Sequence, residues 1–427
     1  MFTFEKLENP TLGIRGLEAD LSEEEQAIQE VAHRFAVEVM RPIGEKLDRM
    51  TPQEVIAEGS PLHEYMEKVQ ESGILDLAAL AEMDNQQKSR IFPIIFEELG
   101  WGDSGLAIAT LAANIPAFAA HASGDAEIIE KFGGGAPGCW LATQPERGSD
   151  LVDMEGSEVH PGATQSKGNL SCRIEGDEVV ITGQSSAWVS FAPLAQTALA
   201  YLPCDSGDGF YHTNGRGLNH VAIFIPLDLP GVSRGKPLDK LGQRSLPQGE
   251  IFFDEVRVPR KYCVATGDEA LNSFVGTLTF ANMEMAATFT GVARAAADHA
   301  LAYVHERKQG GVPIIQHQSV QLRMFNLWQK VEAARALTQR VFNFNYSTKG
   351  PHLMASVTSK TFVTDTAFDV ASEALQLFGG NGLTKEYPIE KILRDARASM
   401  IEDGENNVLK LKGMRWLSRH YLEHNEV

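Results

Sequence analysis

The sequence predicts an α+β fold that is mainly helical. Its pattern changes from helical periodicity to short β-type runs at about residue 139 and returns to long helices at about residue 269. This segregated order is typical of α+β proteins rather than of alternating βαβ units. No GxGxxG motif follows a strand, so nothing indicates a Rossmann dinucleotide site. With 427 residues, 43% of them hydrophobic, the chain is long enough for two or three domains.

We expect residues 1–138 to form an N-terminal α-helical domain. Ser22 and Glu25 have the spacing of a capping box, in which each residue satisfies a backbone N–H of the other, so a helix should begin there. Residues 97–100 (Glu-Glu-Leu-Gly) predict the end of a second helix at its glycine. Residues 106–122 are the most apolar stretch, but they are short for a bilayer span and contain asparagine and proline. We interpret them as a buried helix.

We expect residues 139–268 to form a middle β domain. Residues 173–175 and 179–181 are β-type runs on either side of Gly176-Asp177, a pattern that predicts a hairpin. Residues 221–225 and 251–253 are further predicted strands.

We expect residues 269–427 to form a C-terminal helical domain. One helix there carries an apolar stripe made of Phe362, Val363, Ala367, Val370, Ala371, Ala374, Leu375 and Phe378. The glycines of residues 379–382 should end this helix.

The composition narrows the classes of function. The net charge is -19 and there is no Lys/Arg cluster, which argues against a nucleic-acid partner. The four cysteines contain no CxxC pair, so the sequence shows neither a zinc motif nor a dithiol redox motif, and we expect reduced thiols. The first residues resemble neither a secretory signal nor a transit peptide, so we expect a soluble cytoplasmic protein without membrane insertion.

Several segments have residue types that suit binding or catalysis. The turn at residues 143–150 offers hydroxyl and backbone N–H groups to an anion, and Trp188 at a strand end could stack on a flat cofactor. Arg307 and Lys308 precede two glycines and suit a phosphate contact. The glycines of residues 379–382 allow a ligand to approach the backbone closely. Each segment taken alone also suits an ordinary turn or helix end.

Three acids crowd together at Glu402, Asp403 and Glu405. Like charges at this spacing raise one another's pKa, which suits a carboxylate that abstracts a proton, although a solvated acidic loop would have the same sequence.

In their order and spacing, these segments resemble the acyl-CoA dehydrogenase family over nearly the whole chain. The matching motifs are Thr143-Gln144-Pro145 with Gly148-Ser149-Asp150, Trp188-Val189-Ser190, Phe253 to Pro259, Gln316-His317-Gln318, Gly379-Gly380-Asn381-Gly382 with Glu386-Tyr387-Pro388, and Arg394-Asp395-Ala396. Gln144 stands where the family pattern has glutamate.

The resemblance implies an N-terminal helical domain, a central β-barrel-like domain and a C-terminal four-helix bundle. It also implies FAD as cofactor, an acyl-CoA substrate, an electron-transferring flavoprotein as electron acceptor, and a homotetramer or dimer in which FAD reaches a neighbouring subunit. The residues that match the family's flavin side are Trp140, Thr143, Gly148, Ser149, Trp188 and Ser190. Those that match its pyrophosphate and adenine side are Arg307, Gln309 and His317, with Gln376, Gly379 and Gly380 from another subunit. Glu405 and Asn407 also match cofactor-binding positions, which hold threonine and glutamine in many relatives.

For the reaction, the resemblance implies α,β-dehydrogenation of an acyl-CoA thioester, in which a carboxylate removes the α-proton and hydride passes to flavin N5. Asp403 matches the position of this base, where most relatives have a glutamate. Aspartate is one methylene shorter, and a shift of about 1 Å can cost on the order of a hundredfold in rate. Some relatives carry the base on an earlier helix, at the position of Ala281, which cannot serve; Glu284 lies near it as a reserve candidate.

Two alternatives remain at this point. The first is a flavin oxidase of a small carbon acid, similar to nitroalkane oxidase, which also uses an aspartate base; its usual arginine seven residues later is Lys410 here. The second is a non-catalytic subunit that binds FAD or CoA, since the usual glutamate is absent.

Overall fold

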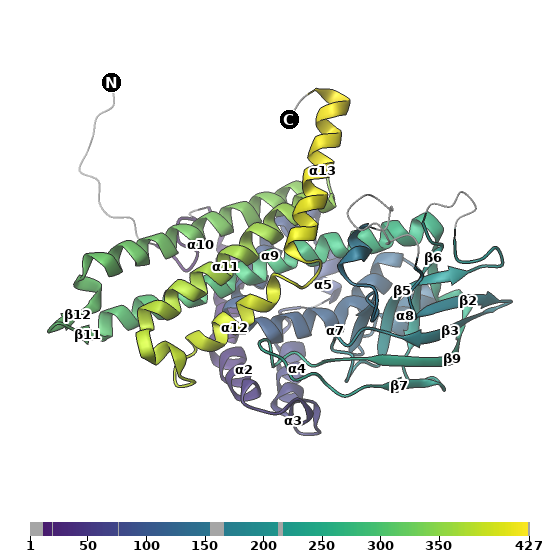
Figure 1. Ribbon diagram of the computed structural model, residues 1–427, viewed down its shortest axis with the longest axis horizontal. Coiled ribbons are helices and arrows are strands. Elements are labelled where there is room, and N and C mark those ends of the chain that lie inside the picture. Colours follow the sequence, from purple (N-terminus) through teal and green to yellow (C-terminus); the bar gives the residue numbers. More distant parts are fainter. Residues whose placement is uncertain (1–11, 19, 76, 154–165, 212–216, 426–427) are drawn as a thin grey trace.

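The computed structural model describes residues 12–425 except 19, 76, 154–165 and 212–216. Helices from the two ends of the sequence lie against a sheet formed by its middle part (Figure 1). The predicted α+β, mainly helical fold class is therefore confirmed. The sheet begins with β1 at Gly138, and the long helices resume with α9 at Gly267.

The first helix begins where the sequence predicts. The Ser22 hydroxyl accepts a hydrogen bond from the Glu25 backbone N–H (3.2 Å), and the Glu25 carboxylate accepts one from the Ser22 N–H (2.8 Å). The helices of this part are α1 (Glu23–Phe35), a π-helical turn (Ala36–Met40), α2 (Arg41–Asp48), α3 (Pro52–Ile56), α4 (Pro61–Ser72), α5 (Leu77–Glu82), α6 (Asn85–Gly102), α7 (Ser104–Ser123) and α8 (Ala126–Phe132).

The apolar helix α7 is a core helix, as predicted. By length and composition it could cross a membrane, but 61% of its apolar window is buried within the structure. It packs beside α6 and against the first strand of the sheet.

The middle part forms an eight-stranded sheet in the order β10-β6-β5-β2-β3-β9-β7, with β1 beside β5. Its strands are β1 (Gly138–Leu141), β2 (Ser171–Glu175), β3 (Glu178–Gln184), β5 (Thr197–Asp205), β6 (His220–Pro226), β7 (Val232–Arg234), β9 (Ile251–Pro259) and β10 (Cys263–Thr266). The short strands β4 (Val189–Ser190) and β8 (Gln248–Gly249) pair separately. The predicted hairpin is the antiparallel pair β2–β3.

Strand β5 separates two hydrophobic clusters. Ala198, Ala200 and Leu202 face the core of the sheet domain. The alternate residues Leu199 and Tyr201 face a cluster shared with α7, α8 and α9. Because side chains alternate along a strand, β5 is buried on both faces and presents Leu199 and Tyr201 to the site described below.

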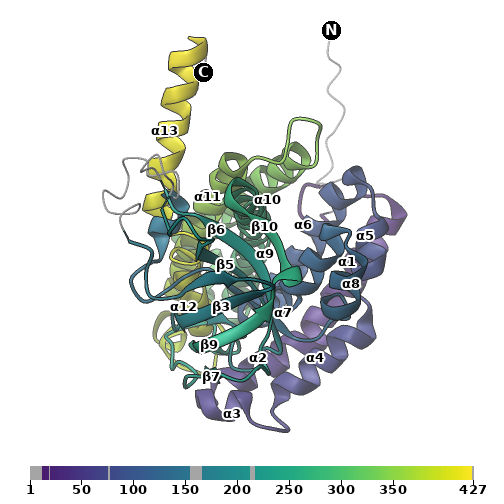
Figure 2. The same cartoon turned by 90° about the vertical axis from the view of Figure 1, so that its right-hand side faces the viewer.

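The C-terminal part contains three long helices, α9 (Gly267–Glu306), α10 (Gln318–Asn345) and α11 (Leu353–Phe378), followed by α12 (Ile389–Ser399) and α13 (Asn406–His424). The strands β11 (Lys308–Gln309) and β12 (Val312–Pro313) connect α9 to α10. Most of the predicted stripe of α11 is buried, but Phe362 is 44% exposed, so its inclusion in the stripe is wrong. Figure 2 shows α13 projecting away from the other helices.

Helices α6 and α9 cross at two glycines. A Cβ on Gly100 would lie 1.9 Å from the Thr288 carbonyl oxygen, and a Cβ on Gly291 would lie 1.9 Å from the Glu97 carbonyl oxygen. Helix α6 continues to Gly102, so the prediction that Gly100 ends its helix is wrong. Gly100 is needed for close packing of two helices rather than for a C-cap.

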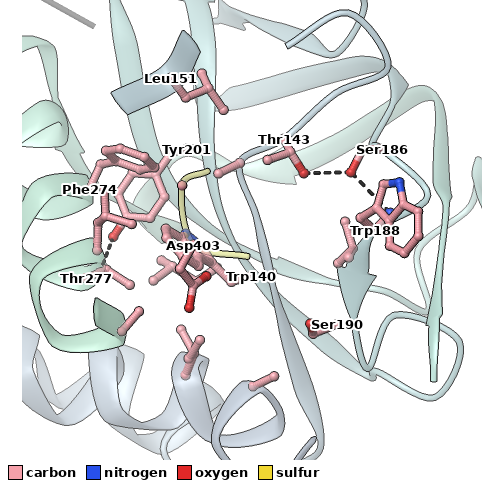
Figure 3. Close-up of a pocket in the computed structure, with 18 of the residues that line it drawn as sticks. Trp140, Thr143, Leu151, Ser186, Trp188, Ser190, Tyr201, Phe274, Thr277 and Asp403 are labelled. Carbon is pink, nitrogen blue, oxygen red and sulfur yellow. Dashed lines mark hydrogen bonds between the residues drawn. The ribbon is translucent and has the colours of Figure 1, made fainter. Parts of the chain in front are cut away.

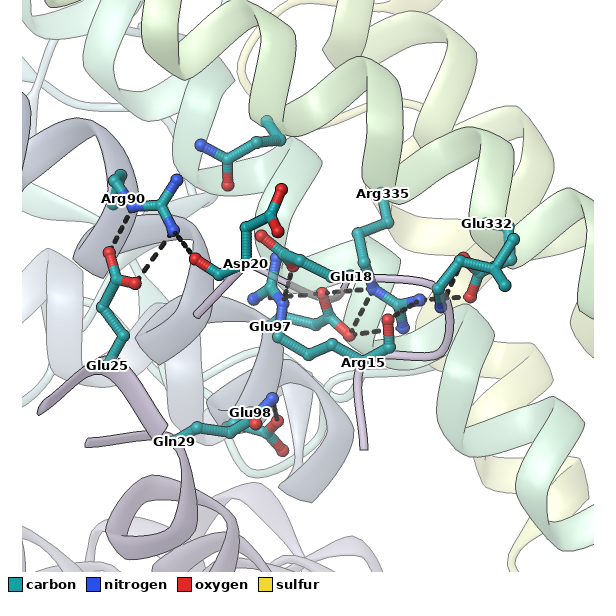
Figure 4. A network of polar contacts seen from close by, with 12 residues as sticks. Arg15, Glu18, Asp20, Glu25, Gln29, Arg90, Glu97, Glu98, Glu332 and Arg335 are labelled. Carbon is teal, nitrogen blue, oxygen red and sulfur yellow. Dashed lines mark hydrogen bonds and ion pairs between the residues drawn. The ribbon is translucent and has the colours of Figure 1, made fainter. Parts of the chain in front are cut away.

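Buried charges connect this crossing to the N-terminal segment (Figure 4). The Glu97 carboxylate accepts hydrogen bonds of 2.9 Å from both Arg294 and Arg335, and Arg15 lies 3.5 Å away. Burial opposes ionisation of Glu97, but the three guanidinium charges outweigh it and hold its pKa well below the usual range. Paired in this way, the charges join α6, α9, α10 and the residues before α1.

Candidate active site

The predicted base, Asp403, lies in the short loop between α12 and α13. Its backbone has a positive φ of 49°, and Gly404 follows with a φ of 97°. Aspartate is one of the few non-glycine residues that tolerate this left-handed conformation. The turn directs the Asp403 side chain into a large cavity (Figure 3).

The Asp403 loop is held from three sides. The Asn282 side-chain amide of α9 donates to the Asp403 carbonyl oxygen at 3.1 Å. The Lys360 ammonium of α11 donates to the Gly404 carbonyl oxygen at 2.8 Å. The Ser149 hydroxyl accepts a hydrogen bond of 3.1 Å from the Glu405 backbone N–H. Contacts from separate elements therefore fix the backbone that carries the predicted base.

The carboxyl groups that line the cavity include Glu284, which is buried, and Glu402 and Asp403, which are half-buried. Burial raises the pKa of Asp403, and the positive charge of Lys360 opposes this rise only in part. Burial raises the pKa of Glu402 to about 7, although Glu402 accepts a 3.0 Å hydrogen bond from Gln243 and faces the charge of Lys240. Burial, with a smaller contribution from the neighbouring acids, raises the pKa of Glu284 to about 8. A dehydrated carboxylate is a stronger base than one in water, which suits proton abstraction.

Two lysines accompany these acids: Lys360 is buried and Lys240 is half-buried. Lys360 has no exposed surface, and its ammonium also donates to the Asn406 side chain at 2.8 Å. Lys240 donates to the Gln248 side chain at 2.7 Å. Burial lowers the pKa of each lysine to about 8, and the nearby acids oppose this fall.

The cavity has a volume of about 1310 Å³. Its walls come from α7, β1, the turn after β1, β4, β5, α9 and the Asp403 loop. The part between α7 and α9 is mostly apolar and includes Ile108, Leu111, Phe280 and Met285. Pockets for single small ligands are typically about 300–1000 Å³, so this cavity has room for a cofactor together with a substrate.

All six residues predicted for the flavin side line this cavity. They are Trp140, Thr143, Gly148, Ser149, Trp188 and Ser190. The Thr143 and Ser186 hydroxyls lie 2.6 Å apart, and the Ser186 hydroxyl accepts from the Trp188 backbone N–H at 3.3 Å. Trp188 is 63% exposed, so its flat ring is available for stacking.

The residues predicted for the pyrophosphate and adenine side lie elsewhere. Arg307, Gln309 and His317 gather around β11, at the end of the long helices that points away from the sheet (Figure 1). His317 contacts the Gln309 carbonyl oxygen at 3.2 Å. The end of α11, which carries Gln376, Gly379 and Gly380, lies nearby, because Phe378 stacks on Tyr303 of α9 with ring centroids 4.1 Å apart. None of these residues lines the cavity of the same chain.

Glu405 and Asn407, also predicted to bind the cofactor, have structural contacts. The Glu405 carboxylate caps α13 by accepting hydrogen bonds from the backbone N–H groups of Asn407 (2.9 Å) and Val408 (3.1 Å). The Asn407 side chain donates to Glu405 at 2.8 Å. Neither residue lines the cavity.

The residues of the cavity fit a flavin. The Trp140 indole N–H is buried and has no partner in the described part of the chain, so the wall holds a donor that a ligand could satisfy. Trp140 lies beside Tyr201 and Phe274, which provide an aromatic surface (Figure 3). Hydroxyl groups of Thr143, Ser149 and Ser190 are further potential partners in the walls.

Sequence reasoning missed Lys360, Lys240, Gln243 and Asn282. Lys360 could have been found, because it continues the buried spacing of α11 through Val363, Thr364 and Ala367 and is a charged residue on an apolar face. The others approach the loop from distant parts of the chain, and no local pattern marks them.

Comparisons with known proteins agree with this geometry. The family described as "Acyl-CoA dehydrogenase, C-terminal domain" matches residues 271–418. The chain is 29% identical to the benzylmalonyl-CoA dehydrogenase of Aromatoleum aromaticum, over 92% of this chain and 98% of that protein. It is 27% identical to the probable acyl-CoA dehydrogenase YngJ of Bacillus subtilis, over 92% and 97%. The structure of butyryl-CoA dehydrogenase from Megasphaera elsdenii matches with a TM-score of 0.78 and 24% identity, over 94% and 100%.

Proposed function

Because the chain belongs to the acyl-CoA dehydrogenase family, whose members are oxidoreductases acting on CH–CH donors, we propose that it dehydrogenates an acyl-CoA thioester with Asp403 as the base. The observation that carries this proposal is the position of Asp403: a half-buried carboxyl group that faces a cavity of about 1310 Å³ from a loop held on three sides. A base must be both positioned and dehydrated to remove a weakly acidic α-proton at neutral pH.

The protein's own groups would act as follows. Asp403 accepts the α-proton, and the charge of Lys360 stabilises the ionised carboxylate before the reaction. The walls made by α7 and α9 exclude water from the acyl group. Trp140, Thr143, Ser149, Trp188 and Ser190 are the residues that would hold the flavin. Bound FAD supplies the hydride acceptor.

We further propose that the acyl group is bulky, branched or cyclic. The apolar region between α7 and α9 is lined by side chains such as Ile108, Leu111 and Phe280, and the cavity has a volume of about 1310 Å³. The relative from Aromatoleum is named a benzylmalonyl-CoA dehydrogenase, and the benzylmalonyl group carries an aromatic ring.

We also propose a homo-oligomer, with an electron-transferring flavoprotein as electron acceptor. The two groups of predicted cofactor-binding residues lie at separate places on one chain, at the cavity and around β11. A second copy that brings its β11 region to this cavity would complete one binding site.

The nitroalkane-oxidase alternative gains no support from Lys410. Its ammonium pairs with Asp365 at 2.5 Å, and it does not line the cavity. The two reactions are separable in solution, since an oxidase would consume oxygen and produce hydrogen peroxide without another acceptor.

An anaerobic titration of the FAD-loaded protein tests the proposed reaction. Straight-chain, branched, cyclic and aryl acyl-CoA thioesters would be added in turn while the absorbance of oxidised flavin is followed. We expect at least one thioester to bleach the flavin. If no thioester of any shape bleaches it, the proposed function is wrong.

A further inference from the structure

Glu284 is a buried acid in the wall of the cavity, next in sequence to the apolar lining residue Met285. It lies on α9 between Phe280 and Met285, is 5% exposed, and lines the same cavity as Ile108 and Leu111 of α7. A carboxyl group is costly to bury in such surroundings unless its hydrogen bonds are satisfied. In binding pockets, a single polar group among apolar walls commonly fixes the orientation of the ligand.

Only one protein group bonds this carboxyl group among the residues that the structure describes. The Thr288 hydroxyl, one helical turn later, donates to Glu284 Oε1 at 2.5 Å. The second oxygen, Oε2, has no such partner and belongs to a side chain that lines the cavity. Thr288 thus orients the carboxyl group and leaves one oxygen for a ligand.

The charges around Glu284 favour its neutral form. The neighbouring charged groups that act on it are the carboxylates of Asp403 and Glu402, and both oppose its ionisation, as does its burial. Arg294 and Arg335 of the same region are committed to Glu97 and Glu98. With Oε1 accepting from Thr288, a proton on Oε2 would be available for donation.

We propose that Glu284 determines specificity by donating a hydrogen bond from its carboxylic acid to a neutral oxygen on the acyl group of the substrate. This inference rests on the proposed function, because it places the acyl group between α7 and α9. It names the substrate class as acyl-CoA thioesters that carry a carbonyl, ether or hydroxyl oxygen beyond the reacting carbons. A substrate with a carboxylate at this place is not expected, because the carboxylates of Asp403 and Glu402 would repel it and a cation would be needed to bind it.

The test compares hexanoyl-CoA with its oxo derivatives, which carry a ketone at each carbon from the γ position onward, and with adipyl-CoA. The measured quantity is the ratio of kcat/KM for each oxo thioester to that for hexanoyl-CoA. Glu284→Gln keeps the size and a donor, whereas Glu284→Met removes the donor. Met285→Leu is the matched control, because it changes an apolar wall at the next position.

In the wild type, we expect at least one oxo derivative to have a higher kcat/KM than hexanoyl-CoA. Glu284→Met should reduce that ratio about tenfold, as expected for one neutral hydrogen bond, while Glu284→Gln and Met285→Leu keep most of it. A wild-type ratio near one for every oxo position would overturn the inference, as would an unchanged ratio in Glu284→Met or a preference for adipyl-CoA. If hexanoyl-CoA bleaches the flavin, these results concern Glu284 alone. If no thioester reacts, the proposed function is wrong and this inference is wrong with it.

Discussion

The Lys360 ammonium lies 2.8 Å from the carbonyl oxygen of Gly404, the residue directly after the proposed base. Lys360 lies in the first third of α11 and is fully buried, and the same ammonium also bonds Asn406. One side chain thus joins α11 to the Asp403 loop, and its positive charge acts on the half-buried Asp403 carboxylate. We infer that Lys360 positions the loop and stabilises the ionised form of Asp403.

Replacing Lys360 with methionine should therefore move the pH profile of flavin reduction. Without the ammonium charge, the pKa of Asp403 should rise further, so flavin reduction should slow on the acidic side of the profile and the midpoint of the profile should move to higher pH. Stopped-flow flavin reduction across pH measures this shift. Lys410→Met, which removes an exposed lysine paired with Asp365, should keep the wild-type profile. A profile that does not move in Lys360→Met would contradict the positioning role.

Glu284 should make the folded protein less stable as pH rises. The ordinary pKa of 4.5 is raised to about 8 in the folded state, so the folded state binds this proton more tightly than the unfolded chain does. The free energy of unfolding should then fall between pH 4.5 and 8. Glu284→Gln has no such proton to lose. Relative to the wild type, its free energy of unfolding should therefore increase by a few kcal/mol, as an order of magnitude, between acid and mildly alkaline pH. Urea denaturation at several pH values measures the difference, and a constant difference would refute the explanation.

The crossing of α6 and α9 should not tolerate a side chain at Gly291. Its Cβ would lie 1.9 Å from the backbone oxygen of Glu97, so the two helices must separate. We expect Gly291→Ala to lower the free energy of unfolding by about 2 kcal/mol or more. Gly413→Ala on α13 is the matched control, since its Cβ meets nothing within 4 Å and alanine favours helix by up to about 1 kcal/mol. Equal effects of the two substitutions would disprove the crowding argument.

Arg307 provides a test of the shared cofactor site. If a second copy brings its β11 region to the cavity, Arg307→Ala should weaken FAD binding although the residue does not line the cavity of its own chain. We expect a rise of about tenfold in the dissociation constant of FAD, as for the loss of one charge-assisted hydrogen bond. Flavin content after dilution, with light scattering on the same samples, measures both binding and assembly. Unchanged FAD retention, or a monomer that holds FAD as tightly as the wild type, would contradict the proposal.

The sequence predicted the elements that depend on local patterns. The capping box at Ser22 and the hairpin around Gly176 both lie where these patterns placed them. The prediction for Gly100 was wrong. A glycine near the end of a helical stretch has the same local sequence whether it ends the helix or allows another helix to cross closely. Only the position of Gly291, almost two hundred residues later, distinguishes the two.

The site was predictable to a similar extent. The motifs placed Asp403 and the flavin-side residues, and the structure brings these together at one cavity. The motifs did not show that Glu405 caps α13, or that Lys360 and Asn282 hold the base loop. Such contacts depend on the packing of α9 and α11 around the loop, which no single segment encodes.

The most direct test of the proposed function is anaerobic flavin reduction in the FAD-loaded Asp403→Asn variant. Asparagine keeps the size of the side chain but cannot accept the α-proton. With a thioester that bleaches the wild type, we predict that the variant still binds the thioester, seen as a perturbed flavin spectrum, but reduces its flavin at least about a hundredfold more slowly. Flavin reduction at the wild-type rate would contradict the account and would assign the base to another group, such as Glu402 or Glu284.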